Sequence, residues 1–200
     1  GIQFYNDYQE LGNEDGFMKS DYLIVNKEIG AMSAFTGAQN TFTEEEIDEF
    51  KESGFVERIG AFTPSSFNVR AQFEVEGFMN FSTEMFFESV PDDFVDVKSD
   101  AWRYVEGSDE IPIILPKNYL DLYNFGYAQG KGLPKLSEGI LGAMRLKILI
   151  GSNGENEEFL GRIVGFSSRL NTILVPEGFM QWANGKYMNS DVAKDPTRLV

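Results

Sequence analysis

The chain has 200 residues, of which 42% are hydrophobic, and a formal net charge of −15 at pH 7. It contains no cysteine and no histidine, which excludes disulfides, thiolate metal sites, histidine-based catalytic triads and the commonest transition-metal ligand. Its 32 acidic residues against 17 basic ones oppose binding to nucleic acid or to an anionic lipid surface.

The N-terminal part of the chain carries the clearest helix start. A strand is predicted over 22–26, and a loop rich in Gly, Ala and Ser follows over 30–40. Thr43 and Glu46 have the spacing of a capping box, so a helix is predicted to begin at Thr43 and to end at Gly54. No apolar run approaches the roughly 20 residues that cross a bilayer, and we expect a soluble chain that is a piece of a larger protein.

The middle of the chain is predicted to be rich in strands. Period-two alternation predicts strands over 55–62 and 67–75, and a turn at Pro91 is predicted to enter a short strand over 91–97. A polar connection over 99–110 carries Trp102. Most of the 18 phenylalanines are expected to fill a core, with a partner-binding patch as the alternative for the rest.

One pattern occurs twice: a short apolar strand that ends in proline and turns directly into a helix. Residues 113–124 and 173–184 both show it, and the helices are predicted to end at Gly126 and Gly185. Two such units predict two similar half-domains packed together.

A hairpin is predicted between these two units. A short helix over 135–141 precedes strands over 146–150 and 158–166, and Asn-Gly at 153–154 is a strong signal for the turn between them. Residues 195–200 are typical of the beginning of a further strand.

Motifs for catalysis or cofactor binding are weak. The glycine-rich segments 130–132 and 151–154 lack the Gly-Lys-Ser/Thr ending of a P-loop, and the acidic run 155–158 does not match an EF-hand. No catalytic residue, cofactor site or metal site is therefore predicted. An enzyme that uses a pair of carboxylates is the least favoured alternative.

The order of these elements resembles the extracytoplasmic core domain of MacB-like and FtsX-like ABC transporter permeases. The resemblance covers about residues 22–200, and the ordered set of motifs carries it. The matching segments are Phe42–Ile47 with Phe55–Ile59, Val90–Phe94, Ile111–Tyr123, Leu146–Ile150 with Gly161–Phe166, and Ile173–Trp182. The segment Phe67–Phe87 departs from the versions of the family's middle insertion.

The resemblance implies an α+β fold and a division of the chain. A porter-like part of two α/β half-units, the strand-proline-helix repeats, would comprise about 20–62 and 110–200, and a β-rich subdomain would comprise about 63–109. It also implies a non-catalytic domain on the periplasmic face of the bacterial inner membrane, in a protein anchored there by transmembrane helices.

The function implied by the resemblance is to couple ATP hydrolysis in the cytoplasm to movement in the periplasm. ATP hydrolysis by an ABC ATPase subunit or domain would drive movement of cargo or of a periplasmic partner, in efflux, lipoprotein release or mechanotransmission. The expected partners are that ATPase, reached through the transmembrane helices, a periplasmic protein or lipoprotein cargo, and a second copy in a homodimer. Nucleic acid is not expected as a partner.

Four aromatic residues are predicted to contact a partner: Phe78, Phe81, Phe86 and Trp102. The alternative function is a secreted peptide- or glycan-binding module that uses this aromatic region and Trp102.

Overall fold

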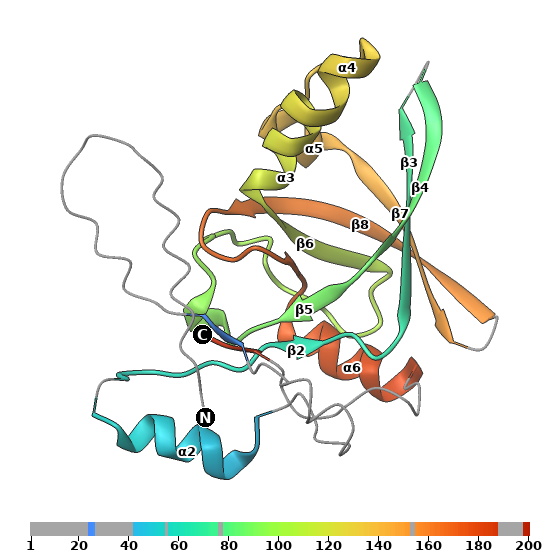
Figure 1. Cartoon of the computed structure of the whole chain (residues 1–200). Helices are drawn as coiled ribbons and strands as arrows, with labels where there is room; N and C mark the ends of the chain where they lie inside the picture. The colour runs from blue at the N-terminus through green and yellow to red at the C-terminus, as the bar shows by residue number, and fades with distance from the viewer. Residues whose placement is uncertain (1–23, 27–41, 55, 76–77, 153–154, 188–197) are drawn as a thin grey trace, which may run out of the picture. The chain divides into compact units, whose positions relative to one another are not determined.

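The computed structural model describes residues 24–26, 42–54, 56–75, 78–152, 155–187 and 198–200 (Figure 1). The chain divides into two compact units, residues 1–62 with 193–200 and residues 63–192. None of the helices in the described ranges combines the length and the apolar character that crossing a membrane requires.

The first unit contains helix α2 (Glu44–Glu52), and the predicted capping box is confirmed. Thr43 Oγ1 accepts from the Glu46 N–H at 3.3 Å, and Glu46 Oε2 accepts from the Thr43 N–H at 2.9 Å. The helix ends as predicted, because Gly54 directly follows the C-cap residue with a φ of 71°, a conformation that glycine adopts without strain.

The same unit has a small antiparallel ladder. β1 (Val25–Asn26) pairs with β10 (Arg198–Leu199), so the described parts of the two predicted terminal strands are confirmed, and residues 22–23 and 195–197 lie outside the described residues. The predicted strand over 55–62 is wrong: it is reduced to a bridge between Ala61 and Leu199, with Phe55 outside the described residues. Among the described residues this segment pairs with 198–200, a partner too short to hold eight residues in a strand.

The second unit is built on one mixed sheet of eight strands, which with its helices confirms an α+β fold. The strand order is β2-β5-β9-β6-β8-β7-β3-β4. In chain order the strands are β2 (Thr63–Pro64), β3 (Asn68–Val75), β4 (Phe78–Met85), β5 (Phe87–Ser89), β6 (Glu110–Pro116), β7 (Arg145–Ser152), β8 (Glu155–Ser167) and β9 (Ile173–Leu174).

The period-two pattern placed β3 correctly. Val69 and Ala71 are buried and face the core, while Arg70 between them is exposed, as the alternation predicts. The side chains of 73–75 lie outside the described residues. The β7–β8 hairpin is also confirmed, because Ser152 pairs with Glu155 and leaves a two-residue connection.

The two strand-proline-helix repeats lie side by side in this sheet. β6 leads into α3 (Lys117–Asp121) and β9 leads into α6 (Glu177–Tyr187). The two strands meet antiparallel at the pair Ile114 and Leu174. β6 runs parallel to β8 and β9 runs parallel to β5, so each repeat has its own parallel neighbour.

The predicted ends of both repeat helices are wrong. α6 continues past Gly185 to Tyr187. α3 continues through the π-helix η2 (Leu122–Ala128) into α4 (Gln129–Lys131), and the left-handed residue that ends it is Gly132, with a φ of 64°. Gly126 does not stop the helix because Ala128, one half-turn later, is fully buried and keeps the chain packed.

The chain then folds back along this helix. The Asn124 side chain accepts from the Leu136 N–H at 2.7 Å and donates to the Leu136 carbonyl at 2.8 Å. α5 (Glu138–Ala143) follows with Ser137 as its N-cap, three residues later than the predicted start. This double hydrogen bond fixes the returning segment to the π-helix.

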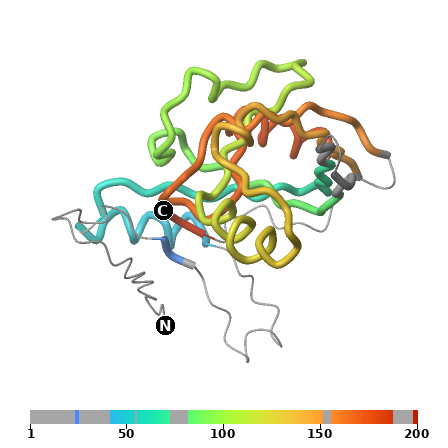
Figure 2. Tube along the Cα trace, turned by 90° about the horizontal axis from the view of Figure 1, so that it is seen from above, coloured from blue at the N-terminus to red at the C-terminus, as the bar shows by residue number. Residues whose placement is uncertain are grey.

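The core of the second unit joins the sheet to its helices. Phe179, Met180 and Ala183 on one face of α6 are fully buried against strand residues such as Ile113 and Ile148. Seen from above, the loop 91–109 and the helical segment 117–143 lie at opposite edges of this unit, with strands between them (Figure 2).

Candidate binding groove

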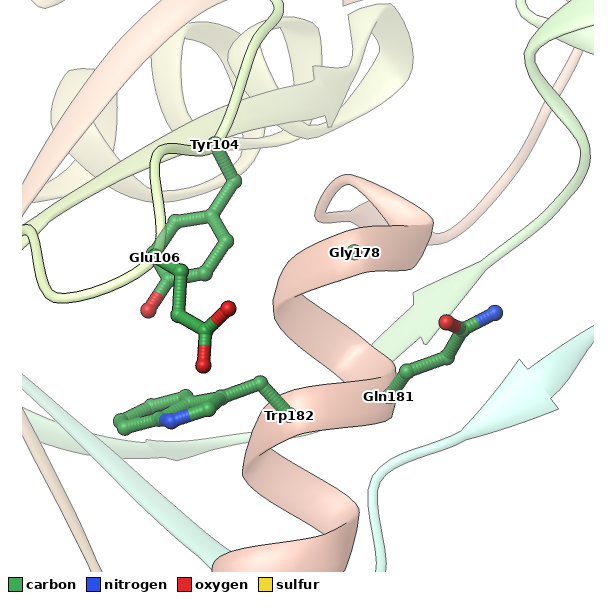
Figure 3. A pocket seen from close by; sticks show the side chains of 5 residues that line it. All are labelled: Tyr104, Glu106, Gly178, Gln181 and Trp182. Carbon is green, nitrogen blue, oxygen red and sulfur yellow. The ribbon is translucent and has the colours of Figure 1, made fainter.

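The surface of the second unit is hollowed where the loop 91–109 lies against the beginning of α6. Two adjoining hollows, of about 400 and 360 Å³, share three residues, and we call them together the groove. The first is lined by Tyr104, Glu106, Gly178, Gln181 and Trp182 (Figure 3). The second is lined by Asp92, Trp102, Arg103, Tyr104, Pro176, Glu177, Gly178 and Gln181.

The helical wall of the groove follows from the pattern of α6. The buried face of this helix leaves Gly178 and Gln181 exposed and Trp182 half-buried. Gly178 has an ordinary helical backbone, and a Cβ added to it would meet no atom within 4 Å. The missing side chain therefore leaves open space in the wall of the groove.

The loop wall is anchored to the end of β8. Asp96 accepts from Ser167 Oγ at 2.5 Å and, through its other oxygen, from the N–H and hydroxyl of Ser168 at 2.9 and 3.0 Å. Val97 packs where Gly165 has no side chain, since all three Val97 side-chain carbons would lie within 3.4 Å of an added Cβ. The predicted strand over 91–97 is wrong: Asp92–Phe94 form the 3-10 helix η1, and side-chain contacts with β8 hold the rest instead of a ladder.

Aromatic rings fix the two walls against each other. The Tyr104 ring meets Phe179 at 5.2 Å and Trp182 at 6.0 Å between centroids. The Trp182 ring also meets Phe159 at 5.9 Å, Phe179 at 5.8 Å and Tyr187 at 5.9 Å. Two of the groove's aromatic side chains are thus held in one orientation by the core beneath them.

The charge of the groove is mainly negative. Asp92, Glu106 and Glu177 contribute carboxylates, and Arg103 contributes one guanidinium. Burial raises the pKa of the Glu177 carboxyl, and the nearby charge of Asp92 raises it further. Burial also raises the pKa of the Tyr104 hydroxyl, while the Gly107 backbone lowers it.

A charged cluster lies at the other end of α6. Glu157 on β8 accepts hydrogen bonds from Lys186 Nζ at 2.7 Å and from the Tyr187 hydroxyl. The Lys186 hydrogen bond and then the Tyr187 hydrogen bond lower the pKa of Glu157, and burial followed by the Glu157 hydrogen bond raises the pKa of Tyr187 to about 12. Lys186 Nζ also lies 4.9 Å from the centre of the Trp182 ring, which joins the cluster to the groove.

The four aromatic residues predicted as partner contacts lie in different places. Trp102 lines the groove, and its indole N–H donates to Asp92 Oδ1 at 3.0 Å. Phe86 lies between β4 and β5, is 80% exposed and does not line the groove. Phe78 and Phe81 belong to β4, and their side chains lie outside the described residues.

Sequence reasoning missed the helical half of the groove. The sequence indicates Trp182 only as part of the second repeat helix, and Glu106 only as part of a polar connection. A glycine at position 178, in the first turn of a helix and next to Phe179 and Met180, is the signal that could have indicated a wall left open. In the ranges that the structure describes, no group of three or more acidic side chains converges in a way that could hold a metal ion.

The mixed sheet, its helices and the acidic, aromatic groove define an α+β domain with a surface suited to noncovalent contact. A family model described as PCD-like, probable transporter periplasmic core domain, matches residues 23–200, and the chain belongs to this family. Neither the curated proteins nor the solved structures yield a match. The family confirms the predicted resemblance to a periplasmic core domain and supports a periplasmic location and a non-catalytic, transporter-associated role.

Proposed function

We propose that this domain couples a membrane transporter to a partner or cargo in the periplasm. An ABC ATPase subunit or domain hydrolyses ATP on the cytoplasmic side, the transmembrane helices of the permease move, and the domain carries the movement outward. The observation that carries this proposal is the family match over residues 23–200, which associates the chain with a probable transporter.

The packing of the second unit suits a body that transmits force. β8 has 13 residues, about 40 Å at the usual rise per residue, and it is paired with β6 on one side and β7 on the other. Its buried neighbours form one continuous core with α6. β7 pairs with residues 155–162 of β8 and β6 pairs with residues 160–167, so both neighbours are paired at 160–162 and β8 links one to the other. A continuous strand that is paired over its whole length resists bending better than a loop does.

The strand-proline-helix repeats support two half-units within the domain. β6 and β9 are adjacent and antiparallel, and each has a parallel partner of its own, as expected for two related units that meet at the centre of a sheet. We assign the repeats to the porter-like part, about 20–62 and 110–200, and the residues between, about 63–109, to the β-rich subdomain.

The proposed partners are a second copy of the chain in the complete transporter and a periplasmic protein or lipoprotein cargo. Phe86 and Trp102, with Phe78 and Phe81, are the proposed contacts with that cargo or partner. Phe86 is 80% exposed, so its ring is accessible to such a partner and would gain stability by being buried in a complex.

The test uses the complete transporter reconstituted in liposomes. The chain has no cysteine, so Phe86→Cys and Val105→Cys, both at exposed positions, introduce unique attachment points within this domain. Bismaleimides of increasing length then join the domains of two copies, and ATP hydrolysis is measured before and after. The same variants labelled with N-ethylmaleimide are the matched control.

We expect the crosslink, but not the single label, to change the rate of ATP hydrolysis at least twofold. Complete crosslinking at both positions with no change in rate would contradict mechanical coupling.

The alternative function, a peptide- or glycan-binding module, is favoured by one observation. The groove combines the aromatic faces of Trp102, Tyr104 and Trp182 with the amide of Gln181, which is the chemistry that binds sugar rings and extended peptides. Under this alternative, the chain binds a glycan or peptide while crosslinking leaves ATP hydrolysis unchanged.

A further inference from the structure

We propose that the groove binds an organic cation, an ammonium or guanidinium group presented either by a small molecule or by a basic side chain of a partner protein. This inference does not depend on mechanical coupling, because it rests on the walls, the charge and the shape of the groove alone.

The walls of the groove present aromatic rings in fixed orientations. Tyr104 and Trp182 are half-buried and in ring contact with each other and with the buried Phe179. The face of an aromatic ring attracts a cation within about 6 Å of its centre, most strongly for tryptophan. The chain itself uses this interaction here, since Lys186 Nζ lies 4.9 Å from the Trp182 ring centre.

The charge around these rings selects a cation over an anion. Three carboxylates line the groove, Glu106 in the first hollow and Asp92 and Glu177 in the second, against one lining guanidinium, Arg103. Lys186, on the Trp182 ring, adds a second positive charge beside the groove, so the carboxylates are still in excess. Figure 3 shows the Glu106 carboxylate pointing from the loop toward the Trp182 ring on the helix. A cation placed between them would meet an aromatic face on one side and a carboxylate on the other.

The shape of the groove leaves room for such a group. The first hollow has a volume of about 400 Å³, and the open space beside Gly178 belongs to it. An ammonium group with its substituents fits this size, which lies at the lower end of the range for small-molecule pockets. A Cβ at position 178 would enter this space and meet no atom within 4 Å.

Tryptophan fluorescence gives a direct readout, because the two tryptophans of the chain, Trp102 and Trp182, both line the groove. The 200-residue chain is titrated with choline, with its neutral isostere 3,3-dimethylbutan-1-ol, and with trilysine. We expect a saturable change in emission with choline or trilysine, weakened by added salt, and none with the neutral isostere. A response to choline but none to trilysine would indicate that the ligand is a small molecule. Tighter binding of trilysine than of choline would indicate that the ligand is a basic segment of a partner protein.

Variants locate the site and separate binding from folding. Gly178→Leu should abolish the response, whereas Gly185→Leu, in the same helix and also with open space around it, should preserve it. Both substitutions favour the helix, so neither is expected to unfold the protein. Glu106→Gln should weaken choline binding about two- to fivefold, the range typical of losing one exposed charge contact.

Three results would overturn the proposal. The first is no saturable response to either cation, and the second is equal binding of choline and its neutral isostere. The third is loss of binding in Gly185→Leu with retention in Gly178→Leu. Unchanged circular dichroism of each variant establishes that the comparison is between folded proteins.

Discussion

Adding a single methyl group at Gly161 should destabilise the second unit. This residue lies in β8, between β6 and β7, and a Cβ placed there would be 2.8 Å from Ile148 Cγ1 and 3.0 Å from Ile113 Cδ1. Carbon atoms in contact normally lie about 3.5–4.0 Å apart, so the neighbours would have to move by more than half an ångström. Ile113 and Ile148 are both fully buried, and overpacking such a site costs about 1–3 kcal/mol.

Gly161→Ala should no longer destabilise this unit when it is made in the variant Ile148→Ala. Ile148→Ala removes the closest atoms and by itself costs about 2–5 kcal/mol, because it leaves a cavity. In that background the methyl of Gly161→Ala enters the vacated space and keeps a single close approach, to Ile113 Cδ1, the end of a side chain that can move into the same space. The loss of glycine's backbone freedom should then make the substitution neutral to stabilising, by up to about 1 kcal/mol. The assay is urea unfolding followed by tryptophan fluorescence, which reports on the second unit because both tryptophans belong to it.

Gly142→Ala serves as the control, since its Cβ would be 3.8 Å from the nearest atom, the Ile163 carbonyl oxygen, and should cost nothing. The reasoning fails if Gly161→Ala is as stable as the parent chain, or if it costs the same with Ile and with Ala at position 148.

Three further predictions concern hydrogen bonds. Thr43→Ala removes the capping box and should destabilise α2 by about 1 kcal/mol, seen as faster amide exchange in its first turn and unchanged exchange in the large sheet. Asn124→Leu keeps the volume but leaves two main-chain groups of the returning segment unpaired, so the midpoint of urea unfolding should fall by an amount equivalent to about 2 kcal/mol; an unchanged midpoint would contradict the role given to this side chain. The hydrogen bonds from Lys186 and Tyr187 lower the pKa of Glu157 below its usual 4.5, so their stabilisation is present above pH 4.5 and is lost as the pH falls through the lowered value. Glu157→Gln should flatten that part of the pH profile and, in an absorbance titration, move the pKa of Tyr187 from about 12 toward 10.

Local patterns predicted the elements whose signals lie within a few residues. The capping box of Thr43 and Glu46 sets the start of α2 by its own hydrogen bonds, and the alternation around Arg70 sets the faces of β3. In both cases the local preference and the tertiary environment agree, which is the condition under which a sequence reports its structure directly.

Helix ends were less predictable because distant packing decides them. Gly126 and Gly185 have the residue type that ends helices, but both keep a helical backbone. The first helix continues because Ala128 is fully buried and because Asn124 donates a hydrogen bond to Leu136, which comes later in the chain. A glycine ends a helix only where packing of the following residues does not stabilise further helical turns.

The groove was only half predictable for a similar reason. Trp102 is conspicuous in the sequence as an aromatic residue in a polar connection. The residues across the groove from it belong to α6, whose apolar pattern is already explained by packing of this helix in the core and does not indicate a groove. The anchoring of the loop depends on Asp96 reaching Ser167 and Ser168, a contact between segments far apart in sequence. No local periodicity carries that information.

The seven residues of η2 coil more widely than an α-helix, with hydrogen bonds to the fifth rather than the fourth residue along. Such a stretch is equivalent to an α-helix into which one residue has been inserted, so the effect of deleting one residue from it can be predicted. Deleting the exposed Gly126 would return the segment to α-helical winding, and the remaining six residues would cover nearly the same rotation as the present seven, because a π-helix turns less per residue than an α-helix. Ala128 would therefore keep its buried position, and the side chains within the segment would shift, among them the exposed Phe125, whose ring centre now lies 4.5 Å from the ammonium of Lys135. A one-residue change of length would be absorbed within η2 and leave the residues after it in place.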